Sequence, residues 1–497
     1  MQYQSTRSDQ DIVSSACAIV QGIAADGGLF VPKTMPQISM NQINNMAQMD
    51  YQGRAFAILK LFLDDFTDDE LKNCISSAYG SGSFDTPAIA PVVKLNNTDF
   101  VLELWHGPTC AFKDMALQIL PHLLTTAMKK LDIKEDIVIL VATSGDTGKA
   151  ALDGFADVAG SKILVFFPQD GVSNIQRAQM VTQDGNNVSV CSVHGNFDDA
   201  QTGVKMIFGE DAFTKQLLEQ GYRLSSANSI NWGRLVPQIV YYFSAYCDML
   251  NSGEITLGQK INFCVPTGNF GNILAGFYAS QMGLPVHHFI CASNSNNVLT
   301  DFIKTGTYDK NRDFYTTFSP SMDILISSNL ERLLYLLGGK DTTKVAGYMD
   351  ELNQKGCYRI DDALKDTLTQ QFYGGYCGEQ ATMDIIRKIW QDNRYLVDTH
   401  TAVACDVCAQ YQEQTGDTTK TVIVSTANPF KFNGSVLQAL GEDIDFDEFT
   451  LLDKLSTKTG ESIPPSLSDL KTKPVRFTKQ CDKQDMKDMV KSMLGII

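Results

Sequence analysis

The sequence predicts an α/β protein built on two open, twisted and mainly parallel sheets that are flanked by helices. Short apolar runs typical of buried strands alternate with helical patterns along most of the chain. Three of these runs, residues 136–142, 261–265 and 421–426, lead directly into a tight polar or glycine-rich turn and then into a helix or a further turn. Ligands of open parallel sheets bind where such turns leave the carboxyl ends of strands, so this pattern also predicts a functional site.

Three parts are expected along the chain, because 497 residues exceed what one simple core can hold. Residues 1–84 form a helix-rich N-terminal domain, in which the nearly all-apolar run 53–63 favours a buried helix. Residues 85–440 form the central α/β region, with two subdomains. Residues 441–497 form a polar C-terminal tail with short helical stretches, which we expect to pack on the central region.

Composition excludes several classes of partner. A net charge of −16 argues against binding to nucleic acid or to an anionic membrane surface. The first ten residues lack a signal-peptide pattern, and no apolar run is long enough to cross a bilayer, which together predict a cytoplasmic location. The 12 cysteines are scattered, and Cys405 and Cys408 fit one face of a helix better than a metal site, so no metal is predicted.

The segment from His106 to Asp114 predicts a site built around one lysine. It follows the strand-like run 100–105, passes through a Gly-Pro turn and enters the helical pattern 115–120. Lys113 therefore opens a helix, where exposed N–H groups and the helix dipole disfavour an ammonium and lower its pKa. A Schiff-base lysine needs such a lowered pKa, although a lysine in a first turn can equally be a solvated side chain.

The combination of segments resembles the threonine synthase family, within the fold type II (tryptophan synthase beta-like) pyridoxal 5′-phosphate (PLP) enzymes. The resemblance covers nearly the whole chain, and many motifs in family order are far more specific than any one of them. The matching segments are residues 3–7, 22–32, 106–114, 142–148, 167–176, 228–234, 268–272, 319–324, 398–402 and 425–432.

The resemblance implies roles for the cofactor-binding residues. Lys113 would carry PLP and act as the base that moves protons on the substrate. The turn of Gly268, Asn269, Phe270, Gly271 and Asn272 would bind the PLP phosphate, since its glycines allow close backbone approach and a helix begins near its end; alternatively it is an ordinary turn with a helix cap.

Thr426 matches the position whose hydroxyl meets the pyridine nitrogen, although it could merely end a strand. Asn428 stands where many threonine synthases have His, and we assign it no role.

For substrate recognition, the resemblance implies that a loop of five residues, Thr143, Ser144, Gly145, Asp146 and Thr147, binds the α-carboxylate. Asp146 is an unfavourable neighbour for an anion unless its carboxylate turns outward and bonds its own loop. The distal phosphate would be bound by Thr109, Ser173, Asn228 and Arg234, each of which could instead be a turn or capping residue. His106 and His400 lie in matching motifs, and either could be a structural histidine.

The implied activity is conversion of O-phospho-L-homoserine and water to L-threonine and phosphate, the last step of threonine biosynthesis, by a carbon–oxygen lyase. Two alternatives stay open: a phospho-lyase that releases 2-oxobutyrate, and a non-catalytic PLP-binding relative. The only partner expected is the small-molecule substrate, and the protein is expected to be a monomer or a homodimer.

Overall fold

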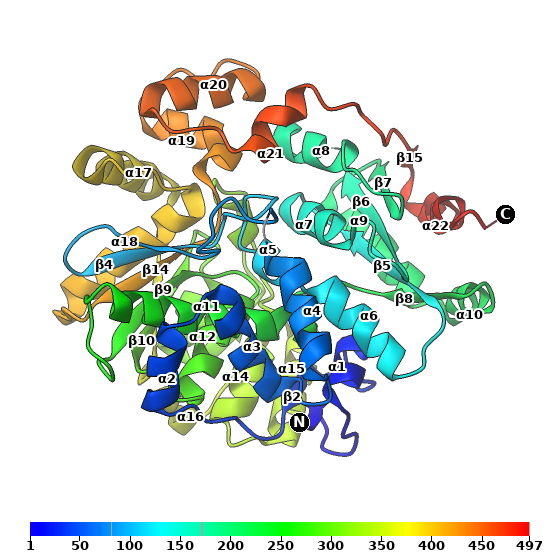
Figure 1. The fold of residues 1–497 in the computed structure, drawn as a ribbon, viewed down its shortest axis with the longest axis horizontal. Coiled ribbons are helices and arrows are strands. Elements are labelled where there is room, and N and C mark those ends of the chain that lie inside the picture. The colour runs from blue at the N-terminus through cyan, green and yellow to red at the C-terminus, as the bar shows by residue number, and fades with distance from the viewer. Residues whose placement is uncertain (81, 170–171, 497) are drawn as a thin grey trace.

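Two main sheets form the framework of the computed structural model, which describes residues 1–80, 82–169 and 172–496 (Figure 1). The six-stranded sheet has the order β13-β10-β9-β14-β4-β3, and the five-stranded sheet has the order β15-β7-β6-β5-β8. Every neighbouring pair in both sheets is parallel except β3 with β4. The predicted fold class, with two open and mainly parallel sheets, is confirmed.

The strands of the six-stranded sheet are β3 (Val92–Lys94), β4 (Asp99–Glu103), β9 (Ile261–Pro266), β10 (Val286–Ser293), β13 (Phe372–Tyr376) and β14 (Thr421–Ser425). Those of the five-stranded sheet are β5 (Asp136–Ala142), β6 (Ser161–Pro168), β7 (Val188–Val193), β8 (Tyr222–Ser225) and β15 (Gln480–Cys481). Two small antiparallel pairs complete the set: β1 (Tyr3–Ser5) with β2 (Phe30–Pro32), and β11 (Thr307–Asp309) with β12 (Cys357–Arg359).

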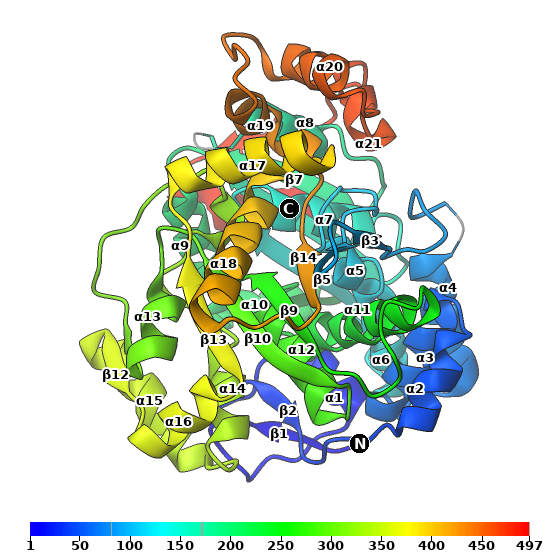
Figure 2. The same ribbon diagram turned by 90° about the vertical axis from the view of Figure 1, so that its left-hand side faces the viewer.

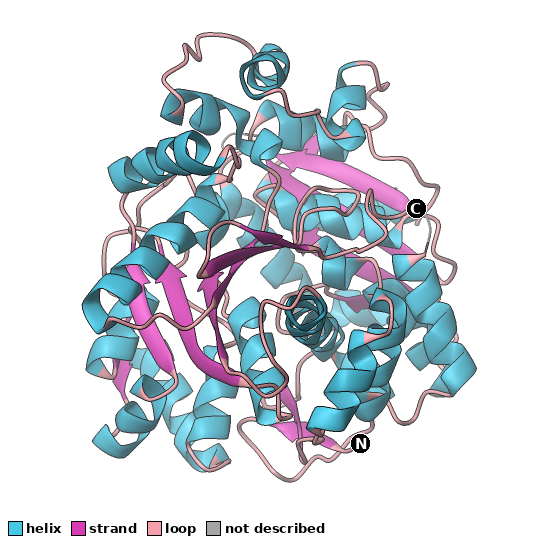
Figure 3. Ribbon diagram, turned by 60° about the vertical axis from the view of Figure 1, so that its left-hand side comes forward, coloured by secondary structure: helices cyan, strands magenta, loops and turns pink. Residues whose placement is uncertain are grey.

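Helices cover both faces of the sheets (Figure 3). On the six-stranded sheet, α18 (Thr399–Thr415) packs against β9, β10 and β14, while α13 (Val298–Thr305) packs against β13. On the five-stranded sheet, α7 (Asp146–Phe155) contacts β6 and α9 (Phe197–Phe208) contacts β5 and β6. This layering buries both faces of the parallel strands, which explains why their sequences are continuous apolar runs.

The N-terminal part is helical, with α1 (Ser15–Gln21), α2 (Met40–Ala47), α3 (Tyr51–Phe62) and α4 (Asp68–Tyr79). Asp50 caps α3 by accepting the N–H of Gly53, and α4 begins with a capping box of Thr67 and Glu70. Helices α2 and α3 pack on α11 (Trp232–Asn251), which also contacts α5 (Asp114–Leu117) and α12 (Gly271–Gln281). The long and almost fully buried α11 therefore joins the N-terminal helices to the elements that carry the site.

The C-terminal segment runs across the molecule and ends beside the five-stranded sheet (Figure 1), and Figure 2 shows its first helices at the end of the molecule opposite the N-terminus. It contains α20 (Glu448–Thr459) and α21 (Pro465–Ser468), then adds β15 beside β7, and ends in α22 (Met486–Leu494), which packs on α9. The remaining helices are α6 (Leu120–Lys130), α8 (Asn174–Val181), α10 (Asp211–Glu219), α14 (Leu330–Leu337), α15 (Thr342–Lys355), α16 (Asp362–Thr369), α17 (Glu379–Asn393) and α19 (Asn433–Ala439).

Short 3-10 helices, among them η1 (Pro320–Met322) and η2 (Pro429–Phe432), complete the secondary structure. Cys405 and Cys408 are buried on α18 as free thiols. Among the described residues, no helix has both the length and the apolar character that crossing a bilayer requires.

Candidate active site

Lys113 lies in a buried polar cluster formed by loops that follow strands of both sheets. It is the N-cap residue of α5 and is only 9% exposed. Its Nζ atom lies 3.3 Å from Oδ2 of Asp146 and 3.3 Å from Oγ of Ser321. Lys113 follows β4 along the chain, whereas Asp146 follows β5, so the two sheets meet at this amine.

Burial is the main reason that the pKa of Lys113 lies below its ordinary value. The carboxylate of Asp146 opposes this shift, while the cations Lys431 and Arg234 add to it. The sequence argument gave the helix N-terminus as the cause. In the structure α5 spans only Asp114–Leu117 and α6 starts anew at Leu120, so a single helical turn is present and burial dominates.

Asp146 turns into the cluster, so the outward orientation that would suit an anion-binding loop is not the one observed. Its Oδ1 atom lies 2.7 Å from Nζ of Lys431 and accepts a hydrogen bond from Nε2 of Gln176 at 3.1 Å. Burial alone would raise the pKa of Asp146, but Lys431 and Lys113 outweigh it and hold the pKa far below its usual range. Two ammonium groups thus make an inward, ionised carboxylate stable.

Lys431 is a member of the cluster for which sequence analysis gave no role. It belongs to η2, which follows β14, and its side chain is fully buried. Besides contacting Asp146, its Nζ donates to the carbonyl oxygen of Thr109 at 2.9 Å. The segment 425–432 was noted as a motif, but nothing local in it shows that this lysine is buried rather than solvated.

A chain of two hydrogen bonds, from Ser321 to His400 and from His400 to Asp398, supports the cluster. The Nε2 atom of His400 accepts the backbone N–H of Ser321 at 3.1 Å, and its Nδ1 atom lies 2.7 Å from Oδ2 of Asp398. This geometry places the imidazole proton on Nδ1, because Nε2 must be an acceptor. His400 and Asp398 are both buried, so His400 fixes the backbone at Ser321.

The glycine-rich turn after β9 provides donors for an anion. The left-handed residue is Phe270 (φ +62°), rather than a glycine, and α12 begins at Gly271. Ser327 Oγ donates to the carbonyl of Gly268 at 2.7 Å and holds the turn in place. The side-chain Nδ2 of Asn272 is buried and, among the described residues, has no hydrogen-bond partner. An unsatisfied buried donor at a helix start fits a phosphate group.

Thr426 lies directly after β14 and is 6% exposed. Its carbonyl accepts the N–H of Phe112 at 2.8 Å, which ties this strand end to the segment that carries Lys113. The neighbouring Ser425 hydroxyl is engaged by Trp105 and Thr401. The Thr426 hydroxyl, in contrast, has no partner within the described parts of the chain, which leaves it free for a ring nitrogen.

The loop from Thr143 to Thr147 is shaped by its first hydroxyl. Thr143 Oγ1 accepts the N–H groups of Gly145 (3.0 Å) and Gly148 (2.9 Å), and Gly145 takes a φ of +143° that only glycine adopts readily. Ser144 is exposed and Thr147 is half-buried. Thr143 therefore serves the loop itself, while Ser144 and Thr147 have side chains that are accessible.

The four residues predicted to bind the distal phosphate differ in their surroundings. Thr109 Oγ1 donates to Asp114 at 2.6 Å, and Ser173 caps α8 by accepting the N–H of Gln176, so both serve local turns. Asn228 is exposed. Arg234 is buried, and its Nη1 donates to the carbonyl of Ala227, but its Nε has no partner among the described residues. Burial lowers the pKa of Arg234 to about 10.

His106 is held between two carboxylates at the edge of the site. Its Nδ1 lies 2.6 Å from Asp85 and its Nε2 lies 2.8 Å from Glu103, and its ring stacks on Trp105. Burial lowers the pKa of His106, but the hydrogen bonds and charges of Asp85 and Glu103 outweigh burial and raise the pKa to about 9. These contacts are those of a structural histidine.

His106 should therefore make stability depend on pH. Because its folded pKa of about 9 exceeds its ordinary value of 6.5, its contribution is complete below pH 6.5 and disappears as the pH rises through 9. We expect His106→Gln to lower the free energy of unfolding by about 1–2 kcal/mol at pH 6, with the difference shrinking toward pH 9.5. Urea unfolding of both proteins across this range measures it, and a difference that does not vary with pH would contradict the assignment.

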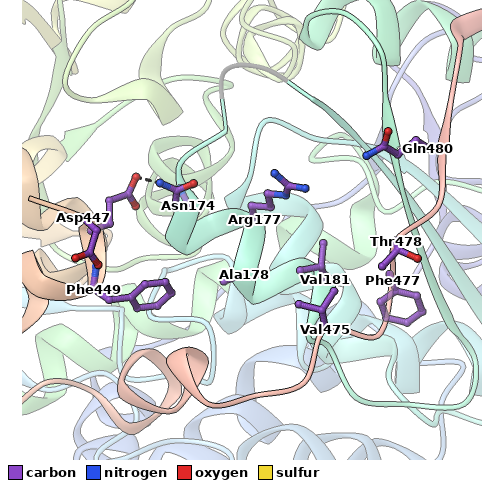
Figure 4. Close-up of a pocket in the computed structure, with 11 residues that line it drawn as sticks. Asn174, Arg177, Ala178, Val181, Asp447, Phe449, Val475, Phe477, Thr478 and Gln480 are labelled. Atoms are coloured by element: carbon purple, nitrogen blue, oxygen red, sulfur yellow. Dashed lines mark hydrogen bonds between the residues drawn. The ribbon is translucent and has the colours of Figure 1, made fainter.

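A separate cavity of about 560 Å³ lies away from the lysine cluster (Figure 4). It is bounded by α8, the start of α20 and the C-terminal segment. Ala178, Val181, Val475 and Phe477 provide apolar walls, and Arg177 lies on its rim. Its described lining residues do not include Lys113, Asp146, Ser321 or Lys431.

Comparisons with known proteins identify the family of this chain. Three family models match the chain: threonine synthase N terminus at residues 2–79, pyridoxal-phosphate dependent enzyme at residues 85–352, and threonine synthase C-terminal at residues 401–491. Threonine synthase of Saccharomyces cerevisiae is 35% identical over 99% of this chain and 98% of its own length. The human protein threonine synthase-like 1 is 43% identical over 85% of this chain, which spans 57% of the length of that relative.

Solved structures show the same relationship. The PLP-bound threonine synthase from Brucella melitensis superimposes with a TM-score of 0.89 and 34% identity, covering 99% of both chains. The yeast threonine synthase superimposes with a TM-score of 0.89 and 33% identity, covering 100% of this chain and 99% of that one. The fold thus belongs to the PLP-dependent enzymes of fold type II. Within that class, the chain is a member of the threonine synthase family, which confirms the resemblance seen in its motifs.

Proposed function

We propose that this protein is a PLP-dependent lyase that converts O-phospho-L-homoserine and water to L-threonine and phosphate. The observation that supports this most strongly is the buried amine of Lys113. It lies where loops that follow the carboxyl ends of strands from both sheets meet. An amine with a lowered pKa can react with the aldehyde of PLP, and the family membership supplies the cofactor class.

The residues present fit PLP. The turn Gly268–Asn272 would hold its phosphate through backbone N–H groups and the free Nδ2 of Asn272. The hydroxyl of Thr426 would meet its pyridine nitrogen. Lys113 would hold its aldehyde carbon. When bound there, PLP supplies an electron sink that makes protons on the neighbouring substrate carbons acidic.

The protein's own groups would then orient the substrate and move its protons. The Nζ atom of Lys113 is the proposed base at the substrate carbons. It lies 3.3 Å from the Ser321 hydroxyl and 3.3 Å from Asp146 Oδ2, and these two oxygens lie 3.4 Å apart. The loop 143–147 would bind the α-carboxylate. The buried guanidinium of Arg234 provides local positive charge for the substrate phosphate in a chain whose net charge is −16.

Product analysis tests the proposed reaction directly. Purified protein loaded with PLP is incubated with O-phospho-L-homoserine, and the products are separated by chromatography. L-Threonine and phosphate in equal amounts are expected. Phosphate with 2-oxobutyrate would identify a phospho-lyase instead, and no product would favour a non-catalytic relative. The cytoplasmic location, the choice between monomer and homodimer, and the domain boundaries at residues 84 and 440 remain predictions.

The two glycines of the phosphate-binding turn should respond differently to valine. A Cβ at Gly271 would make ordinary contacts with Asn329 Nδ2 at 3.5 Å and Gln238 Nε2 at 3.9 Å, whereas a Cβ at Gly268 would lie 2.8 Å from the carbonyl oxygen of Ser321. Gly271→Val should therefore keep the fold and weaken PLP retention by about tenfold or more, since the branched side chain blocks the phosphate. Gly268→Val should lower thermal stability as well.

Equilibrium dialysis against PLP and thermal unfolding of the cofactor-free protein separate these effects. Gly347→Val is the matched control, because Gly347 lies in the helix α15 with open space around it. Wild-type PLP affinity in folded Gly271→Val would contradict the proposed phosphate site.

A further inference from the structure

Lys431 and Lys113 share one buried carboxylate. The Nζ atom of Lys431 lies 2.7 Å from Oδ1 of Asp146, and that of Lys113 lies 3.3 Å from Oδ2. The exposed fraction of the Lys431 side chain is 0%, so solvent does not compensate for its charge. Burying an ammonium is costly unless it is paired and hydrogen-bonded, so the position of Lys431 calls for a specific role.

The two oxygens of Asp146 face different groups. Oδ1 contacts the Nζ atom of Lys431 and accepts a hydrogen bond from the Nε2 of Gln176 at 3.1 Å. Oδ2 faces Lys113 and the hydroxyl of Ser321. Lys431 is itself fixed by its hydrogen bond to the carbonyl of Thr109. Oδ1 of Asp146 is therefore held in place, and this determines that Oδ2 faces Lys113 and Ser321.

We propose that Lys431 is a positioning residue, which holds Asp146 ionised and turned so that Oδ2 faces the Nζ atom of Lys113. The inference rests on the proposed function only for the role of Lys113 as the cofactor lysine. Once Lys113 is joined to PLP, its amine no longer serves Asp146 as a free ammonium. Lys431 then remains as the counter-charge that keeps this buried carboxylate ionised and in place.

The same arrangement affects how readily Lys113 loses its proton. Burial is the main cause of the lowered pKa of Lys113. The charge of Lys431 lowers this pKa further, whereas Asp146 raises it. Without the charge of Lys431, Asp146 would pair with Lys113 alone. The pKa of Lys113 would then rise, and fewer molecules at neutral pH would carry the free amine that reacts with an aldehyde.

Competitive labelling of the cofactor-free protein measures this pKa without any assay of activity. Limiting acetic anhydride is applied across a range of pH, and the labelled fraction of Lys113 is read by mass spectrometry. In Lys431→Met the midpoint should rise by about one pH unit, while Lys431→Arg, which keeps the charge, should stay near wild type. An unchanged midpoint in Lys431→Met overturns the proposal.

Lys149→Met is the matched control, because Lys149 is also buried and paired, but with Asp153 and Gln183 outside the cluster. Its Lys113 midpoint should equal that of wild type. If Lys431→Met does not fold, as judged by circular dichroism, Lys431→Gln replaces it, since glutamine removes the charge yet keeps an N–H for the carbonyl of Thr109.

A double variant distinguishes positioning from charge alone. On an Asp146→Asn background, Lys431→Met should shift the Lys113 midpoint by less than it does in the wild-type background, because the carboxylate through which Lys431 acts is gone. The direct effect of the Lys431 charge on Lys113 gives a shift on both backgrounds, so shifts of equal size would show that Asp146 contributes nothing to the effect of Lys431, which contradicts positioning.

Kinetics with O-phospho-L-homoserine provide an independent readout. Positioning predicts a kcat lowered about tenfold or more in Lys431→Met, with KM little changed. A raised KM with unchanged kcat would instead make Lys431 a substrate ligand. If wild-type protein forms no threonine, the proposed reaction fails, yet the labelling result on Lys113 still decides the role of Lys431.

Discussion

Lys113→Ala is expected to abolish the visible absorption of the PLP-loaded protein and to reduce threonine formation by about 10²–10⁴-fold. The expectation follows from two features of this amine. It lies in a buried cluster whose environment lowers its pKa, and it is within 3.3 Å of both Asp146 and Ser321. Alanine removes the single amine that is proposed both to hold the cofactor and to move the protons.

Borohydride reduction of the wild-type protein followed by peptide mapping checks the assignment. The pyridoxyl label should lie on Lys113. Lys431 is the competing residue, because its ammonium belongs to the same cluster. A label on Lys431, or normal turnover by Lys113→Ala, would show that the wrong lysine has been chosen. Lys149→Ala, which removes a buried lysine outside the cluster, should keep both absorption and activity.

The sheets could be predicted from the sequence because their signal is local. The apolar run 136–142 coincides with β5, and the run 421–426 overlaps β14 (Thr421–Ser425). Parallel strands covered on both faces must be continuously apolar, so each strand can be recognised in the sequence as an apolar run. The pairing of β15 with β7 could not be predicted in this way, because β15 has two residues and its partner lies far away in sequence.

The site was predicted less completely, because it depends on charge pairing between distant segments. The glycine-rich turn and Lys113 are visible in the sequence as local motifs. The direction of Asp146 is not, since it depends on Lys431, which reaches it only after β14 and β5 have been placed in their two sheets. Without that second ammonium, the outward orientation would have been the correct inference for a carboxylate beside an anion.

Thr426→Asp is expected to retain PLP but to form threonine at least about 100-fold more slowly than wild type. The hydroxyl of Thr426 has no partner among the described residues, and Phe112 holds its backbone beside the segment of Lys113. A hydroxyl tolerates an unprotonated pyridine nitrogen, whereas a carboxylate would keep that nitrogen protonated. The stronger electron sink would over-stabilise negative charge at the substrate α-carbon and slow the later steps at the neighbouring β-carbon.

Thr426→Ser, which loses only a methyl group, should keep most of the activity. Steady-state kinetics and PLP titration of the three proteins test this, and normal turnover by Thr426→Asp would place the Thr426 side chain away from the pyridine nitrogen.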